Sequence, residues 1–265
     1  MKHAWEVYRH PPVALVVIEV RHTASAAFTP EQEASIKEHI ADAFPLSQPL
    51  QSPLVVSVGF SGPGGSSMQA IPPRYTNRER TAAVTFNSQV LLLETTQYGE
   101  FATLMDLLQL ALTARQAVAP LDGLERLGLR YIDEIRVPDT GPIDWSKWVD
   151  SSLVGPAQLA AATGLAMQDH QALARFQVSD DHTIALAYGP RHGFAVADKP
   201  LVRTLPPAGP FFLLDIDSSW TTPGAIPKFE PSHIMRLCEE LHEPVNALFE
   251  ASITNQLREE VLRNA

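Results

Sequence analysis

Alternating or β-branched apolar residues recur along the chain and predict a protein rich in strands. Residues 13–21 (VALVVIEVR) follow two prolines and predict a strand, and residues 54–60 and 211–220 predict two more. Residues 81–98 predict a hairpin that turns near Asn87, and residues 172–198 predict two or three short antiparallel strands. The intervening stretch 61–80 has a loop-like composition.

Helical periodicity separates these strands. Thr29 followed by Pro30 predicts a helix over residues 29–44, because threonine caps helices and proline favours the first helical turn. Apolar residues spaced at helical period predict a second helix that ends near Pro120. Short helices are expected around Trp145 and over residues 156–167, and a long one from Ser232, with a kink or restart at Pro244.

This order of elements predicts the α+β class, with antiparallel sheets that are each backed by helices. Strands do not alternate regularly with helices, so a doubly wound parallel sheet is not expected. Residues 1–140 and 141–265 each contain antiparallel strands and a helix. We therefore expect two similar α+β halves, or one integrated domain.

The stretch LGLRYIDEIRVP (127–138) alternates like a strand but carries charges on both faces. Arg130, Glu134 and Arg136 share one face with Ile132. The other face is apolar except for Asp133, which lies beside Tyr131 and has no obvious partner.

Two hypotheses account for the first of these charged faces. Buried charges are usually paired, so Arg130 is expected at the centre of an ion-pair layer, with Glu19 and Asp215 or Asp217 as the acids. The alternative is a pocket around Arg130, Tyr131, Asp215 and Asp217. In that pocket Arg74, Arg78 and Arg80, from the loop-like stretch, are candidate anion contacts.

Other motifs carry weaker signals. The loop GFSGPGGSS (59–67) lacks the lysine and the following helix of a phosphate-binding loop. Cys238 and His242 would share a helix face, but Cys238 falls within an apolar stripe and further metal ligands are not evident. We expect no metal and no cofactor.

Charge and cysteine content restrict the function classes. The 265 residues carry a formal charge of −10, which disfavours nucleic-acid binding. Nucleic-acid binding stays a minor alternative because the segment RYTNRER (74–80) contains three arginines and a tyrosine. The single cysteine excludes an intrachain disulfide, and the apolar runs are too short to span a membrane. These features predict a cytoplasmic protein.

Several segments together resemble a sporadically distributed prokaryotic family of unknown activity. They are LRYI at 129–132, LDID at 214–217 and LFEASIT at 248–254, and the resemblance covers nearly the whole chain. The position after LRYI is often asparagine in that family, whereas here it is Asp133. The family's patchy distribution implies a link to mobile or defence genes.

Our first functional hypothesis is a non-catalytic component, an adaptor or an antitoxin- or immunity-like protein, that binds another protein and could form a homodimer. It follows from the acidic composition and the incomplete catalytic motifs. The alternative is an enzyme or a sensor for a nucleotide or small anion, so enzymatic activity stays open.

Overall fold

A computed structural model describes residues 6–48, 72–139, 141–165, 167, 170–196 and 201–263. The strand expected at 54–60 and the glycine-rich loop at 59–67 lie outside these ranges.

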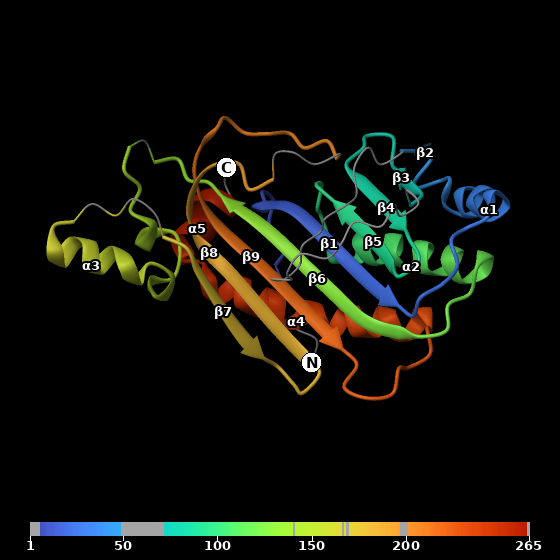
Figure 1. The fold of residues 1–265 in the computed structure, drawn as a ribbon. Coiled ribbons are helices and arrows are strands. Elements are labelled where there is room, and N and C mark those ends of the chain that lie inside the picture. Colours follow the sequence, from blue (N-terminus) through green and yellow to red (C-terminus); the bar gives the residue numbers. More distant parts are fainter. Residues whose placement is uncertain are drawn as a thin grey trace.

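The described strands form a single antiparallel sheet with the order β2-β3-β4-β5-β1-β6-β9-β8-β7 (Figure 1). Their bounds are β1 Val13–His22, β2 Leu46–Ser47, β3 Arg74–Thr76, β4 Ala82–Phe86, β5 Val90–Thr95, β6 Leu124–Ile135, β7 Ala172–Gln177, β8 His182–Gly193 and β9 Gly209–Thr221. The α+β class with a helix-backed antiparallel sheet is confirmed. The predicted hairpin is β4 and β5.

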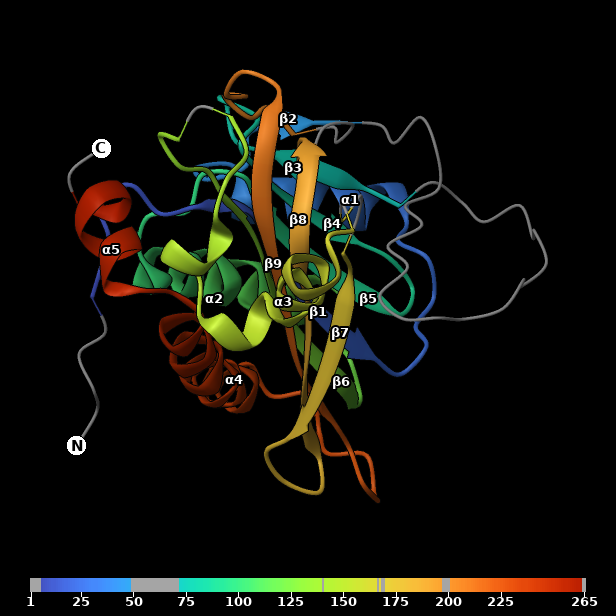
Figure 2. The same cartoon turned by 90° about the vertical axis from the view of Figure 1, so that its left-hand side faces the viewer.

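Two long helices, α2 (Phe101–Val118) and α4 (Pro231–Ser252), cover one face of this sheet (Figure 2). The shorter helices are α1 Pro30–Ile40, η1 Trp145–Lys147, η2 Ser151–Leu153, α3 Gly155–Thr163, α5 Asn255–Leu257 and η3 Arg258–Leu262. Thr29 caps α1 as expected, through its hydroxyl and the backbone N–H of Gln32. No described helix has both the length and the apolar character needed to cross a membrane.

Three details of the structure refine the sequence-based expectations. Arg74–Thr76 is strand β3 and not loop, because its backbone pairs with β2 and β4. Helix α4 continues through Pro244 and does not restart there. The halves on either side of residue 140 share one sheet, since β6 pairs with β9 over ten register positions from Arg126–Thr221 to Ile135–Phe212.

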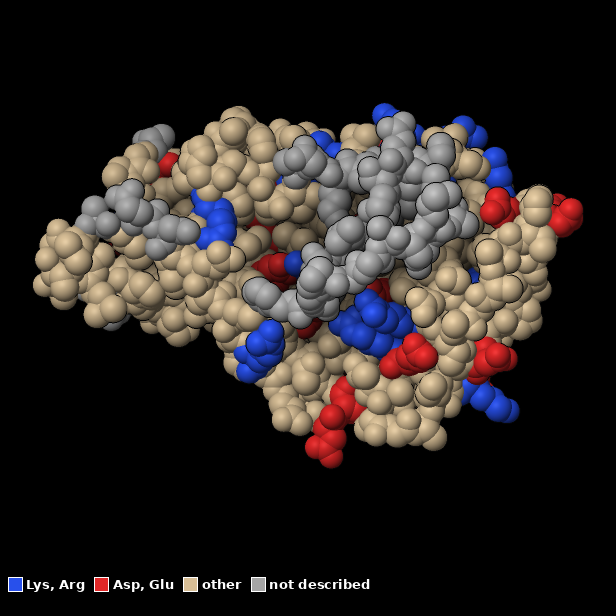
Figure 3. All heavy atoms as spheres, viewed as in Figure 1, with Lys and Arg blue, Asp and Glu red and all other residues tan. Residues whose placement is uncertain are grey.

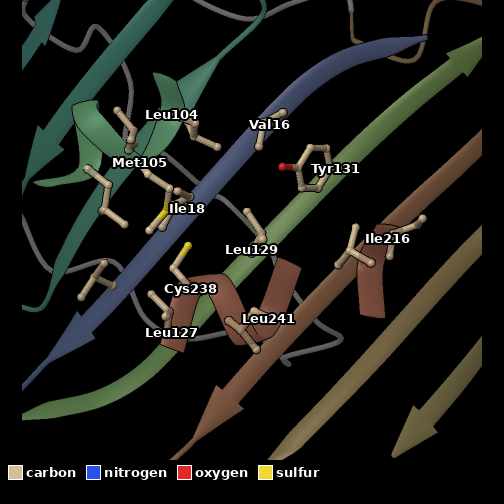
Figure 4. Packing of buried hydrophobic residues seen from close by; sticks show 14 of the residues in the cluster. Val16, Ile18, Leu104, Met105, Leu127, Leu129, Tyr131, Ile216, Cys238 and Leu241 are labelled. Carbon is tan, nitrogen blue, oxygen red and sulfur yellow. The ribbon is translucent and has the colours of Figure 1, made fainter. Parts of the chain in front are cut away.

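The main core lies between the sheet and the two long helices. Figure 4 shows how alternate residues of the strands, such as Ile18 and Leu129, point toward Leu104 of α2 and Leu241 of α4. Each of these side chains is almost completely buried. The period of two along each strand therefore assigns one face to the core and leaves the other face for charged residues.

Leu129→Ala should lower the free energy of unfolding by about 2–5 kcal/mol, because it leaves a cavity in this core. Leu173→Ala, at a side chain in β7 that is 47% exposed, is the matched control and should change stability by less than about 0.5 kcal/mol. Chemical denaturation measures both. Equal effects would contradict the placement of Leu129 at the centre of the core.

Candidate functional site

The charged residues of β6 and β9 lie on the sheet face opposite the helices. Arg130 sits across from Asp217 in the register, yet its guanidinium pairs with Asp215, with Nε–Oδ1 and Nη2–Oδ2 distances of 2.7 and 2.6 Å. This two-pronged hydrogen bond to Asp215 raises the pKa of Arg130. Arg130 is therefore held by a partner, as the ion-pair hypothesis expects.

Glu19 of β1 belongs to the same layer but pairs with other arginines. It accepts hydrogen bonds from Arg126 Nη1 at 2.6 Å and from Arg21 Nε at 2.8 Å. Arg126 also approaches Asp217 at 3.9 Å. Burial raises the pKa of Asp217, partly offset by Arg126 and Arg130. Figure 3 shows acidic and basic side chains gathered together on this face of the molecule.

Glu134 anchors the far end of the layer. Its buried carboxylate accepts hydrogen bonds from Arg136 Nε at 2.7 Å, Arg203 Nη1 at 2.7 Å and the backbone N–H of Ala195 at 2.9 Å. Burial alone would raise the pKa of Glu134, but these donors together lower it below its usual value. Glu134 thus attaches the chain after β8 to the central strand.

The three arginines considered as anion contacts are not equivalent. Arg74 is buried and pairs with Glu94, with Nη1–Oε2 at 2.5 Å. Arg78 and Arg80 are exposed in the turn that follows β3. The structure therefore does not present the three as one basic surface.

A cavity of about 350 Å³ lies on the opposite, helix-covered side of the sheet. The central strands β6 and β9 form its floor, α4 and the start of α2 form its walls, and residues 6–13 border it. Its described lining includes Tyr8, Tyr98, Phe101, Tyr131, Asp133, Ile216, His242, Val245, Asn246, Phe249 and Glu250. This volume is within the range of small-molecule sites.

Asp133 is the chemically unusual residue of this cavity. Its side chain shares the core face of β6 with Leu129 and Tyr131, and the residue is 2% exposed. Within the described part of the chain, its carboxyl has neither a hydrogen-bond partner nor an ion-pair partner. Burial, together with the nearby charge of Asp215, raises the pKa of Asp133 to about 8. A buried acid without a partner is costly and marks a functional candidate.

Aromatic rings surround this acid. Tyr131 donates its hydroxyl hydrogen to the Tyr98 hydroxyl at 3.3 Å, and the two rings meet edge to face with centroids 5.3 Å apart. His242 of α4 stacks on Phe101 of α2, with centroids 3.6 Å apart and ring planes 5° from parallel. Burial lowers the pKa of His242 to about 4, so its imidazole is neutral at physiological pH.

Ion pairs fasten the border of the cavity. Tyr8 donates a hydrogen bond to Glu250 Oε1 at 2.8 Å, and Arg258 Nε contacts Glu250 Oε2 at 2.9 Å. Arg263 pairs with Glu6 through Nη2 and Oε2 at 2.5 Å. These contacts hold the segment before β1 against the C-terminal end of the chain.

Two further arrangements contain residue types that are used in catalysis, a cysteine near a histidine and a histidine near a serine. Cys238 is fully buried, and burial raises the pKa of its thiol to about 12. The described lining of the cavity includes His242 but not Cys238. His182 Nε2 lies 2.8 Å from Ser218 Oγ, but both residues are buried in the core and Ser218 donates to the Leu241 carbonyl oxygen. The described residues contain no group of three or more potential metal ligands.

Sequence reasoning identified part of this cavity. The strand alternation placed Asp133 next to Tyr131 on the apolar face and left it without a partner. It did not bring Tyr98, Phe101 and His242 to the same place. Phe101 and His242 come from two helices, and Tyr98 from the segment before the first of them, so their meeting depends on how these elements pack on the sheet. Comparisons with models of known protein families and with curated proteins find no match for this sequence.

Asp133→Asn should stabilise the protein increasingly as the pH rises from about 4 to 8. Because the pKa of Asp133 is about 8, the folded state keeps the carboxyl proton up to about that pH, whereas the unfolded chain releases it near the ordinary aspartate pKa of 3.8. The folded state binds more protons in this window, so Asp133 lowers stability by up to about 1.4 kcal/mol per pH unit. Urea unfolding of both proteins at several pH values measures the difference.

His242 acts in the opposite direction, because its lowered pKa makes stability rise with pH between about 4 and 6.5. Comparing Asp133→Asn with the unaltered protein cancels this contribution. A stability difference that stayed constant with pH would show that Asp133 has an ordinary pKa.

Removing one partner of the Arg130–Asp215 pair should cost about 2–4 kcal/mol, because the other charge stays partly buried. Arg130→Met combined with Asp215→Leu should cost less than the sum of the two single variants. A double-mutant cycle by chemical denaturation measures this coupling. Additive effects would show that the pair contributes no net interaction.

Proposed function

We propose that this protein binds a small molecule in the cavity around Asp133 and acts as a non-catalytic sensor or binding component. The observation that carries the proposal is a buried carboxyl group, without a partner among the described residues, that faces a cavity of about 350 Å³. A ligand that pairs with Asp133 would offset the cost of burying it. This cavity lies on the other side of the sheet from the pocket expected around Arg130 and Asp215.

The composition of the lining favours binding over catalysis. The described lining residues include no serine, threonine, cysteine or lysine that could act as a nucleophile. His242 is stacked and its pKa is about 4, which makes it a weak base at neutral pH. Aromatic and aliphatic groups dominate the remainder, as in many binding pockets.

Ala102→Trp tests this proposal by obstructing the cavity. Ala102 is an exposed residue of α2 that lines the cavity, so a larger side chain can enter without disrupting the core. Ala117→Trp, at an exposed position of the same helix outside the described lining, is the matched control. Native mass spectrometry and thermal-shift screening with a metabolite library should detect a ligand for the unaltered protein and Ala117→Trp.

Ala102→Trp should lose at least about tenfold in affinity for that ligand, equivalent to 1.4 kcal/mol. Equal binding by Ala102→Trp and Ala117→Trp, or no ligand for any of the three proteins, would contradict the proposal.

A second candidate function is docking of a partner protein on strand β7. This strand ends the described sheet and pairs with β8 on one side. Leu173 and Phe176 of β7 and the following Val178 are 47%, 44% and 50% exposed. Apolar edge strands of this kind are usually protected in natural proteins, and a strand from a partner would cover the apolar side chains and the free backbone groups. The partner would belong to the defence-linked system that the family resemblance implies.

Leu173→Lys should abolish capture of such a partner in pull-downs from the native host, because it places a charge on the edge strand. Leu46→Lys makes the same change on β2, at the opposite edge of the sheet, where Leu46 is 37% exposed. Capture that survives Leu173→Lys, or that both variants abolish equally, would count against docking at β7.

A further inference from the structure

The geometry points to a small organic cation, an amine in its protonated or quaternary form, as the ligand of the Asp133 cavity. This inference rests on the proposed binding function and specifies its ligand class. Three independent observations support it: the charge of the lining, the arrangement of its aromatic rings and the unpartnered carboxyl at its floor.

The charged groups of the cavity have one sign. Its described lining contains four acidic residues, Glu6, Glu100, Asp133 and Glu250, and neither lysine nor arginine. Glu6 and Glu250 pair with Arg263 and Arg258, which lie outside the described lining. Glu100 and the ionised form of Asp133 would therefore repel an anionic ligand and attract a cation.

The aromatic rings supply the second recognition element. Tyr98 and Tyr131 meet at a right angle beside Asp133, with an interplanar angle of 88°. Tyr8 and Phe249 form another edge-to-face pair at the border, with ring centroids 6.3 Å apart. Ring faces attract organic cations, and several faces around one site are typical of sites for quaternary ammonium groups.

The carboxyl of Asp133 gives this environment its selectivity. A metal ion would need several more oxygen or nitrogen ligands, and the described residues do not supply such a group. An organic cation needs one counter-charge and an apolar surface for its alkyl groups. Asp133 on the floor and Ile216 and Val245 in the lining provide these.

Binding of a cation should be coupled to proton release. The pKa of Asp133 is about 8 in the unliganded protein, so the carboxyl is largely protonated at neutral pH, and a bound cation stabilises the charged form. Affinity should therefore increase as the pH rises from about 6 to 8. Among the described residues, the other titratable groups that line this space are Tyr8, Tyr98, Tyr131, Glu6, Glu100, Glu250 and His242.

Glu6, His242 and the three tyrosines are not expected to produce the same pH dependence. Burial raises the pKa values of Tyr8, Tyr98 and Tyr131 above the ordinary tyrosine value of 10, and it lowers the pKa of His242 to about 4. The hydrogen bond from Arg263 lowers the pKa of Glu6. Asp215, on the other face of the sheet, remains paired with Arg130.

Isothermal titration calorimetry with matched probes tests the inference. Choline is compared with its neutral carbon analogue 3,3-dimethylbutan-1-ol, and phenethylammonium with 2-phenylethanol. The buffer is phosphate, because amine buffers would compete. Each cation should bind at least about tenfold more tightly than its neutral analogue, a difference of 1.4 kcal/mol.

Two variants connect this preference to the cavity. Asp133→Asn keeps the shape of the side chain but removes its charge, so it should reduce cation affinity at least about tenfold and abolish the rise with pH. Asp106→Asn removes an equal charge from an exposed residue of α2 outside the described lining, and it should leave affinity within about twofold. Thermal melts of each variant verify folding.

The possible outcomes distinguish the ligand class from the binding function. Neutral analogues that bind as tightly as the cations, or affinity that falls as the pH rises, would overturn the cation inference but leave the binding site in place. Failure of both cations and neutral analogues to bind would also overturn the inference. If the library screen likewise found no ligand sensitive to Ala102→Trp, the proposed binding function would fail as well.

Discussion

The pairing of β6 with β9 is the contact on which the rest of the structure depends. It joins the strands before residue 140 to those after it, and it brings α4 onto the same face as α2. Its register places Arg130 near Asp215 on one face and Tyr131 opposite Ile216 on the other. Because side chains alternate along a strand, a slip of one residue would move the charges into the core and the apolar residues out of it. The ion pairs and the cavity are thus consequences of one register.

The sequence was most informative where one strand or one helix decides the outcome. The alternation in β6 separated Arg130 and Glu134 from Tyr131 and Asp133, and the Thr29–Pro30 pair identified the start of α1. It was less informative where distant segments meet. Arg126 and Arg203 were not anticipated as members of the charged layer, because their partners Glu19 and Glu134 are set by the register and by the chain after β8. The stacking of His242 on Phe101 likewise depends on how α2 and α4 cross.

The contrast between Glu134 and Asp133 shows how the same chemical group serves different purposes. The two residues are neighbours on β6, both almost completely buried. Glu134 receives three hydrogen bonds, so its pKa falls and its charge stabilises the fold. Asp133 receives none from the described residues and its pKa rises to about 8. Packing requirements alone would favour an apolar residue at position 133. A ligand that pairs with the Asp133 carboxyl when it binds would account for the cost of burying this group.

The two faces of the sheet are electrostatically linked through its thickness. The charge of Asp215 contributes to the raised pKa of Asp133, although the two carboxyls project from opposite faces. Arg130 holds Asp215 in place and compensates its charge. The ion pair on the open face therefore influences how readily Asp133 ionises in the cavity. A cation bound at Asp133 would lower the local negative potential and relieve the repulsion between the two carboxyls. In this way the charged layer would adjust the affinity of the proposed site behind it.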